Sequence, residues 1–235
     1  RYINVGIILH FSIMKEVIMK KLLFWIVLIV GTVALLGSCA KKEESTTAAA
    51  AGVCTTCDPL TSTTTAAGSI TVGSATLSGT YATSCFNDAS DFSEGSAPSD
   101  MKSYGYLFIV RGNDNVTEET NYYTDSICST KGYTKKNVYD NVTVGSASGS
   151  NYQVALIWKQ IKILVTTTVS ETWVEGIFGG SYDFVVDTEK ILTASASNQQ
   201  KYNLWNVSAT TFEMGNNVPC CTFPSKLNGV EYTKQ

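Results

Sequence analysis

The sequence predicts an all-β domain over residues 70–235, built as an antiparallel meander that closes into a barrel or folds into a two-sheet sandwich. Its composition is one reason, because Thr, Ser, Tyr, Val, Asn and Gly dominate this region and charged residues are sparse. The other reason is that strand-like runs recur at fairly even spacing, with turn signals between several of them. This length is enough for one domain with one core.

The strand-like runs extend from the start of the domain almost to its end. In chain order they cover residues 70–85, 104–111, 116–124, 137–144, 152–163, 164–170, 182–186, 202–207 and 211–214. Turn signals occur at 112–115, 145–151, 179–180 and 208–210. The helical candidate is the short segment 171–175, which can equally form a loop.

The run at residues 104–111 is expected to lie at the centre of the sheet. Its side chains alternate between two faces, and neither face is charged before Arg111. One face carries Tyr104, Tyr106, Phe108 and Val110, and the other carries Gly105, Leu107 and Ile109. Because both faces are apolar, we expect this strand to be covered on both sides.

A different kind of segment precedes the domain. Residues 19–39, MKKLLFWIVLIVGTVALLGSC, combine a short basic start, an uncharged apolar stretch and small residues directly before a cysteine. This run resembles the signal peptide and lipobox of bacterial lipoproteins. The resemblance implies that residues 19–38 are removed and that Cys39 carries the acyl chains that anchor the protein to a membrane. The alternative is an uncleaved transmembrane helix, for which the apolar run is short.

Residues 1–18 are expected to be an untranslated leader. Residues 15–19 can be encoded by a sequence that contains AAGGAGG, a bacterial ribosome-binding site, a few nucleotides before an ATG. Translation would then start at Met19. The alternative is a longer signal peptide that starts at Met14.

Residues 39–69 are expected to form the lipid anchor and a flexible tether, because their Thr, Ala and Ser-rich composition cannot bury apolar surface. Aspartate directly after the lipidated cysteine resembles an inner-membrane retention signal in enterobacteria, and here that position is Ala40. The expected location is therefore the bacterial cell envelope, at the outer membrane, with the membrane face left open.

Charge and histidine content exclude several classes of function. Removing residues 1–38, with four basic residues and one acidic residue, changes the formal net charge from -3 to -6, which argues against a nucleic-acid partner. The same step removes His10, the single histidine. We therefore expect no catalytic triad, no metal site, no cofactor and no enzymatic activity.

Several segments of the domain resemble the lipocalin-like β-barrels of uncharacterised bacterial secreted and lipid-anchored proteins. These segments are LSGTY at 77–81 followed by Cys85, YYTDSIC at 122–128, YNLWNVS at 202–208 and EYTKQ at 231–235. The resemblance implies a lipocalin-like barrel over residues 70–235 and a disulfide between Cys85 and Cys128. A two-sheet sandwich is the alternative.

The cysteines support export independently. Apart from Cys39 the chain has an even number of them: Cys54, Cys57, Cys85, Cys128, Cys220 and Cys221. Cys54 and Cys57 could bridge to Cys220 and Cys221, or each of these two pairs could close locally. A redox role for Cys54 and Cys57 lacks a βαβ context. A zinc site lacks the usual ligand spacing at Cys220 and Cys221.

The aromatic side chains are the candidate ligand contacts. In a lipocalin-like barrel Tyr106, Phe108, Trp158 and Phe184 would surround a small hydrophobic or amphipathic ligand. In the alternative, a structural or interaction protein of the envelope, these side chains fill a packed core. An interior opening of about 300 Å³ or more would favour the binding protein.

Overall fold

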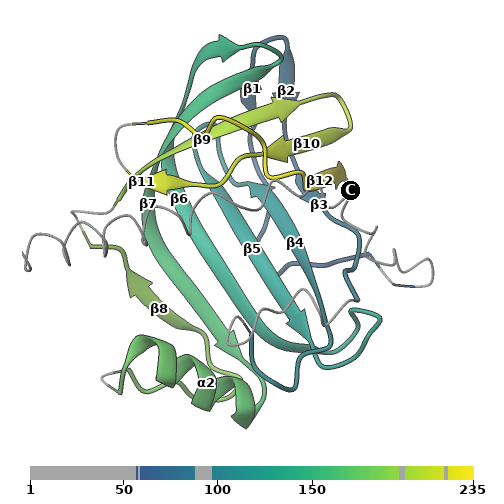
Figure 1. Cartoon of the computed structure of the whole chain (residues 1–235), viewed down its shortest axis with the longest axis vertical. Coiled ribbons are helices and arrows are strands. Elements are labelled where there is room, and N and C mark those ends of the chain that lie inside the picture. The colour runs from purple at the N-terminus through teal and green to yellow at the C-terminus, as the bar shows by residue number, and fades with distance from the viewer. Residues whose placement is uncertain (1–56, 58, 88–96, 181, 196–198, 220–221) are drawn as a thin grey trace, which may run out of the picture. The chain divides into compact units, whose positions relative to one another are not determined.

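The computed structural model describes residues 57, 59–87, 97–180, 182–195, 199–219 and 222–235 (Figure 1). The expected leader, the signal peptide, Cys39, Cys54, Cys220 and Cys221 lie outside these residues. In chain order the elements are β1 (Ile70–Val72), β2 (Ala75–Leu77), β3 (Thr80–Ala82), β4 (Ser103–Val110), β5 (Val116–Tyr123), β6 (Lys131–Ser148), β7 (Asn151–Val165), α2 (Thr168–Phe178), β8 (Lys190–Thr193), β9 (Gln200–Val207), β10 (Thr211–Met214), β11 (Val218–Pro219) and β12 (Glu231–Lys234).

Eight of the strands form a closed antiparallel barrel. Around the ring the order is β3, β4, β5, β6, β7, β9, β10 and β12, and β12 pairs back with β3. The closing pairs are Thr233 with Ala82 and Lys234 with Tyr81. Around the ring the strands follow one another in chain order, so the barrel is an up-and-down meander, and β8 and β11 are added to it at β7 and β9. The prediction of a lipocalin-like barrel is thereby confirmed, and the sandwich alternative is wrong.

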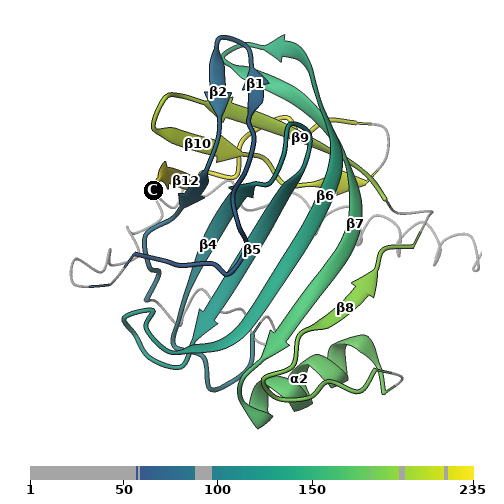
Figure 2. The same ribbon diagram turned by 180° about the vertical axis from the view of Figure 1, so that it is seen from behind.

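The ring closes around only one part of its longest strands. β3 has 3 residues and β12 has 4, whereas β6 has 18 and β7 has 15. In Figure 2 the lower parts of β4 to β7 extend beyond β9, β10 and β12 towards α2. The hairpin of β1 and β2 lies at the opposite end of these strands (Figure 1). The barrel interior therefore changes along its length.

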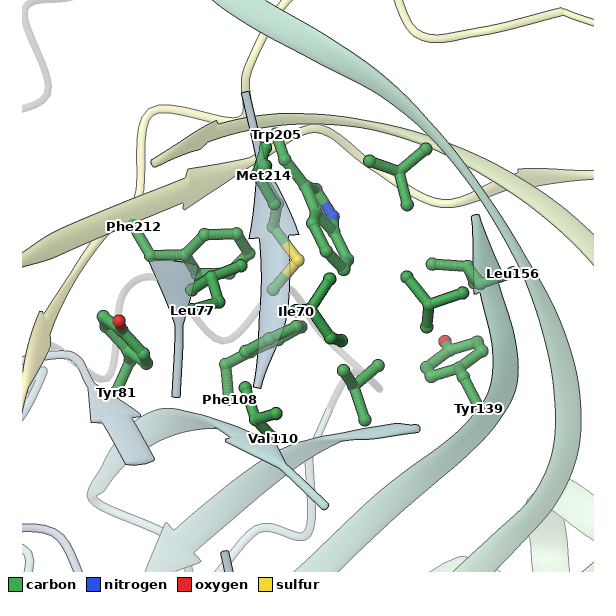
Figure 3. Close-up of a cluster of buried hydrophobic side chains, with 14 of the residues drawn as sticks. Ile70, Leu77, Tyr81, Phe108, Val110, Tyr139, Leu156, Trp205, Phe212 and Met214 are labelled. Atoms are coloured by element: carbon green, nitrogen blue, oxygen red, sulfur yellow. The ribbon is translucent and has the colours of Figure 1, made fainter. Parts of the chain in front are cut away.

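Large aromatic and aliphatic side chains fill the closed part of the barrel (Figure 3). The Phe108 ring lies 4.4 Å from that of Phe212 and 5.4 Å from that of Trp205, between ring centroids. All three side chains are completely buried, and Ile70 and Leu77 of the β1–β2 hairpin join them. This part of the interior is a packed core.

The outer face of β4 is covered as well, as the sequence predicts. Leu107 and Ile109 point away from the barrel interior and are buried in a second cluster with Leu60. A Cβ added at Gly105 would overlap Leu60 Cδ1 and lie 3.1 Å from its Cδ2. Glycine at this strand position therefore permits the covering segment to approach the wall.

The covering segment corrects the expected extent of the tether. The composition predicts that residues 59–69 belong to the tether, but Leu60 is only 3% exposed. Ala67 N donates to Val110 O at 2.9 Å, and Lys131 Nζ donates to Thr61 O at 2.7 Å. This segment docks on the barrel although it is poor in apolar residues, because backbone and side-chain groups of the strands form hydrogen bonds with its backbone. The packed structure thus begins before Ile70.

The disulfide implied by the resemblance is confirmed. Cys85 and Cys128 are bonded, with their Cα atoms 5.9 Å apart, and both are buried in the outer cluster beside Leu60. Cys57 is also disulfide-bonded. Cys54, Cys220 and Cys221 lie outside the described residues, so the pairing expected among these three cysteines and Cys57 stays a prediction.

Two of the expected strands are interrupted or misplaced. The run 70–85 forms β1, β2 and β3 because the chain turns at Gly73 and Gly79, whose φ angles are 61° and 85°. The run 164–170 ends with β7 at Val165. The side chain of Thr167 then accepts a hydrogen bond from Ser170 N and begins α2.

Other boundaries also shift. Residues 182–186 form no strand, and β8 follows at Lys190–Thr193 instead. Residues 145–151 were expected to form a turn, yet β6 continues to Ser148 and the chain turns at Gly149, where φ is 65°. Residues 171–175 are helical, and the helix that contains them is α2, which is longer at both ends.

Candidate functional site

Beyond the packed core, the barrel holds a pocket of about 350 Å³, which we call the Glu118 pocket. The register of β4, β5 and β6 explains its chemistry, because successive inward side chains form rows across the three strands. From the core outward these rows are Phe108, Glu118 and Asn137, then Tyr106, Thr120 and Lys135, then Tyr104, Tyr122 and Tyr133. The interior thus passes from apolar through polar to aromatic.

Glu118 is the centre of a hydrogen-bond network. Asn217 Nδ2 donates to its two carboxylate oxygens at 2.8 and 3.0 Å. The Tyr139 hydroxyl donates to Glu118 Oε2 at 3.1 Å. Asn203 Nδ2 in turn donates to Asn217 Oδ1 at 2.6 Å, which fixes the orientation of that amide. The carboxylate is therefore held in place before any ligand binds.

Burial controls the electrostatics of this pocket. It raises the pKa of Glu118, while the hydrogen bonds from Asn217 and Tyr139 and the charge of Lys135 act in the opposite direction. Burial lowers the pKa of Lys135, and Glu118 partly offsets that effect. Burial and the Glu118 charge together raise the pKa of Tyr139 and of Tyr232. The site thus combines a carboxyl group, an amine and two phenols, and burial shifts the pKa of each towards its neutral form.

Aromatic rings continue from the Glu118 pocket towards α2. Tyr106 lies at the pocket, and its ring centroid is 5.4 Å from that of Tyr104. Tyr104 is 6.1 Å from Tyr122, which stacks on Tyr133 at 5.4 Å. Tyr133 meets Trp173 of α2 at 5.6 Å. We call Tyr104, Tyr122 and Tyr133 the tyrosine row, and its first two members are half-buried.

The side chains of the tyrosine row pack against one another, but Tyr104 and Tyr122 remain partly exposed. Burial raises the pKa of Tyr122 to about 12, so its hydroxyl stays protonated at physiological pH. Beneath the row, Val174 of α2 is buried against Ile163 and Val165 of β7. This apolar contact places the helix at the far end of the long strands.

The structure does not bring the four expected ligand contacts together. Tyr106 lines the Glu118 pocket, whereas Phe108 is completely buried in the packed core. Trp158 packs against the same core, with Lys201 Nζ 5.1 Å from its ring centroid. Phe184 is 1% exposed in a separate cluster with α2. Phe108 and Phe184 therefore lie in packed clusters and do not line the Glu118 pocket.

The polar members of the site were missed by the sequence analysis. Glu118, Asn137 and Asn217 carry the pocket's hydrogen-bonding capacity. A signal for Glu118 exists, because it lies two residues after Val116 on a strand whose alternate positions turn inward. An acidic residue at an inward position indicates a polar interior. Asn217 lies in a connection, where no periodic pattern could identify it.

Other kinds of site find little support in the described part of the chain. No group of three or more His, Cys, Asp or Glu side chains there could hold a metal ion. Nor is any helix in that part long and apolar enough to cross a membrane. The chain matches no protein-family model and no curated protein. The fold and the Glu118 pocket define a barrel with an amphipathic interior site.

Proposed function

We propose that this protein is a lipid-anchored binding protein of the bacterial cell envelope, and that its barrel holds a small amphipathic molecule in the Glu118 pocket. The observation that carries the proposal is the pocket of about 350 Å³ beside the packed core. Its volume is in the range of small-molecule sites. The proposal concerns reversible binding without chemical conversion of the ligand.

The chemistry of the pocket favours an amphipathic ligand over a purely apolar one. Glu118, Asn137 and Thr120 offer polar groups on one part of the wall, and Tyr106 and Tyr232 offer ring surface. A ligand without hydrogen-bonding groups would leave the carboxylate of Glu118 without water at a cost in free energy. A polar group that donates to Glu118 avoids this cost.

The anchoring half of the proposal rests on the resemblance of residues 19–39 to a lipobox. Attachment through Cys39 would hold the barrel beside a membrane, where amphipathic molecules are abundant. The competing function is a structural or interaction protein of the envelope without a ligand. The fully buried Phe108, Trp205 and Phe212 favour it, because they pack together as a core in the closed part of the barrel.

Native mass spectrometry of the protein purified from its own membrane tests the proposal directly. We expect an additional mass from a small molecule that is released when the protein is unfolded. A clean apo mass together with a retained protein partner would support the structural function instead.

A fluorescence titration with N-phenyl-1-naphthylamine tests the site. This probe combines aromatic rings with one amine hydrogen that can bond to Glu118. Tyr106→Ala should weaken its binding about three- to tenfold, because a ring contact contributes roughly 0.5–1.5 kcal/mol. Tyr182→Ala is the matched control, because Tyr182 is exposed and lies next to α2. Equal affinities of the two variants would contradict the assignment of the pocket.

A further inference from the structure

A second pocket, of about 390 Å³, lies on the outside of the barrel, and we call it the outer pocket. Its floor is formed by outward-facing side chains of β5, β6 and β7. Thr117 of β5 belongs to it, whereas its neighbour Glu118 points into the barrel. Residues 63–65 of the covering segment contribute hydroxyl groups to its wall. The two pockets thus lie on opposite faces of the same sheet.

Cationic side chains gather in the outer pocket. Arg111, Lys136 and Lys162 line it, against the single lining carboxylate of Glu189. Lys136 and Lys162 are directly opposite each other on β6 and β7. Like charges at such positions repel, so their pairing opposes sheet stability. The Glu189 carboxylate lies within ion-pair distance of both ammonium groups and offsets part of this repulsion, and a second anion would offset more of it.

The acidic side chains near Lys136 and Lys162 do not accept all of the hydrogen bonds that these lysines can donate. Glu189 is 3.8 Å from Lys136 Nζ and 3.6 Å from Lys162 Nζ, which are ion-pair distances without hydrogen bonds. Buried Glu119 lies 3.8 Å from Lys136, but it already accepts hydrogen bonds from Asn121 and Ser62. Lys136 Nζ donates to Thr63 Oγ1 at 2.8 Å. Within the described residues, the Lys162 ammonium donates no hydrogen bond.

Two buried polar atoms of the outer pocket lack a hydrogen-bond partner among the described residues. They are Arg111 Nε and Thr117 Oγ1, and Thr117 is only 1% exposed. The other contacts of the Arg111 guanidinium are long: 3.5 Å to Val116 O, 3.4 Å to Tyr139 O and 3.5 Å to Asp140 Oδ1. Buried groups of this kind are nearly always satisfied in folded proteins. Their convergence on one pocket indicates an acceptor that enters from solution.

We propose that the outer pocket binds a phosphate group, with Arg111, Lys136 and Lys162 supplying charge and Thr117 supplying a hydroxyl donor. A phosphate has several acceptor oxygens pointing in different directions, which suits donors that arrive from three strands and a loop. Arginine and lysine are the usual partners of this group. The phosphate could be free or part of a small phosphomonoester.

Isothermal titration calorimetry of the full chain with inorganic phosphate tests the proposal. The reference titration uses sodium chloride at matched ionic strength, because surface attraction alone is screened by salt. We expect saturable binding at one site in phosphate only. A parallel titration with glycerol 3-phosphate distinguishes the sources: tighter binding than phosphate identifies a phosphomonoester, and weaker binding identifies the free ion. Absence of saturable binding of both compounds would overturn the proposal.

Variants locate the binding. Arg111→Gln and Lys162→Gln should each weaken phosphate binding about tenfold or more, because each removes a charged hydrogen-bond donor. Thr117→Val should weaken it while keeping the shape of the side chain. Lys102→Gln is the control with the same change of charge, because Lys102 is exposed and does not line the pocket. Denaturant midpoints close to wild type show that the variants fold. A folded Arg111→Gln or Lys162→Gln that binds phosphate as wild type does would overturn the assignment.

Discussion

At Gly105 the barrel wall and the segment outside it approach too closely for a side chain. Gly105→Ala should lower the free energy of unfolding by about 1–3 kcal/mol, because the new methyl group displaces the buried Leu60 side chain. Gly176→Ala is the control. Apart from its chain neighbours and the nearby backbone of α2, no atom lies within 4 Å of its Cβ position, and alanine there should raise stability by roughly 0.5–1 kcal/mol. Urea denaturation measures both, and a neutral Gly105→Ala would contradict the observed packing.

Glu118 should make stability depend on pH. Burial raises its pKa above the ordinary value of 4.5, so the folded state keeps this proton to higher pH than the unfolded chain does. Between the two pKa values the folded state binds more protons, and the free energy of unfolding therefore falls as pH rises. Relative to Glu118→Gln, wild type should be most stable below about pH 4.5 and lose stability towards neutral pH.

Denaturant unfolding of wild type and Glu118→Gln at several pH values measures this difference. Glu231→Gln removes an exposed carboxylate of β12 and serves as the control with the same chemical change. A constant difference between wild type and Glu118→Gln across the pH range would show that Glu118 is not the group responsible.

The sequence identified part of the candidate site at this scale. Tyr106 was found because aromatic residues on alternate strand positions are visible in a single run. Phe108, two residues away on the same face, is in the core instead, because the ring of strands closes around it and not around Tyr106. That difference depends on where β3 and β12 end, and no local pattern of β4 contains this information.

Among the elements, the Cys85–Cys128 disulfide ties the segment after β3 to the loop between β5 and β6. It spans a sequence separation of 43, for which loop-closure entropy gives a stabilisation of about 4 kcal/mol. Replacing both cysteines by alanine should lower the free energy of unfolding by about this amount in urea. Non-reducing peptide mapping is the companion measurement, and a free thiol at either position would contradict the bond.

The sequence predicts a strand correctly where strand-forming residues occupy the whole segment. Residues 104–111 and 116–124 are strand-like along their whole length, and they match β4 and β5 within one residue at each end. The run 164–170 failed because its β-branched residues favour a strand, whereas the hydroxyl of Thr167 ends the extended chain and caps α2. Capping is a property of one side chain and one amide, so an average over the segment conceals it.

At the scale of the whole molecule, a barrel and a sandwich differ by a few long-range pairs. Closure depends on β12 meeting β3, through Thr233 with Ala82 and Lys234 with Tyr81. These partners are far apart in the chain, and their local composition is the same in either architecture. Closure creates an inner and an outer surface on one sheet, and β5 contributes Glu118 to the first and Thr117 to the second. Two sites of different chemistry can therefore lie at neighbouring residues of one strand, on opposite faces of the sheet, without touching each other.

The proposed anchoring also concerns the whole molecule, and Cys39 is the residue that tests it. Cys39→Ala removes the sulfur to which a diacylglycerol would attach, so the variant should remain an uncleaved or soluble precursor. Each buried methylene of an acyl chain contributes roughly 0.8 kcal/mol, so losing the chains should release the protein from the membrane. Metabolic labelling with an alkyne fatty acid, followed by membrane fractionation, measures both effects. Cys57→Ala is the control, because Cys57 is disulfide-bonded and its loss should leave the lipid label in place. Label that persists in Cys39→Ala, or that is absent from wild type, would exclude the lipobox assignment.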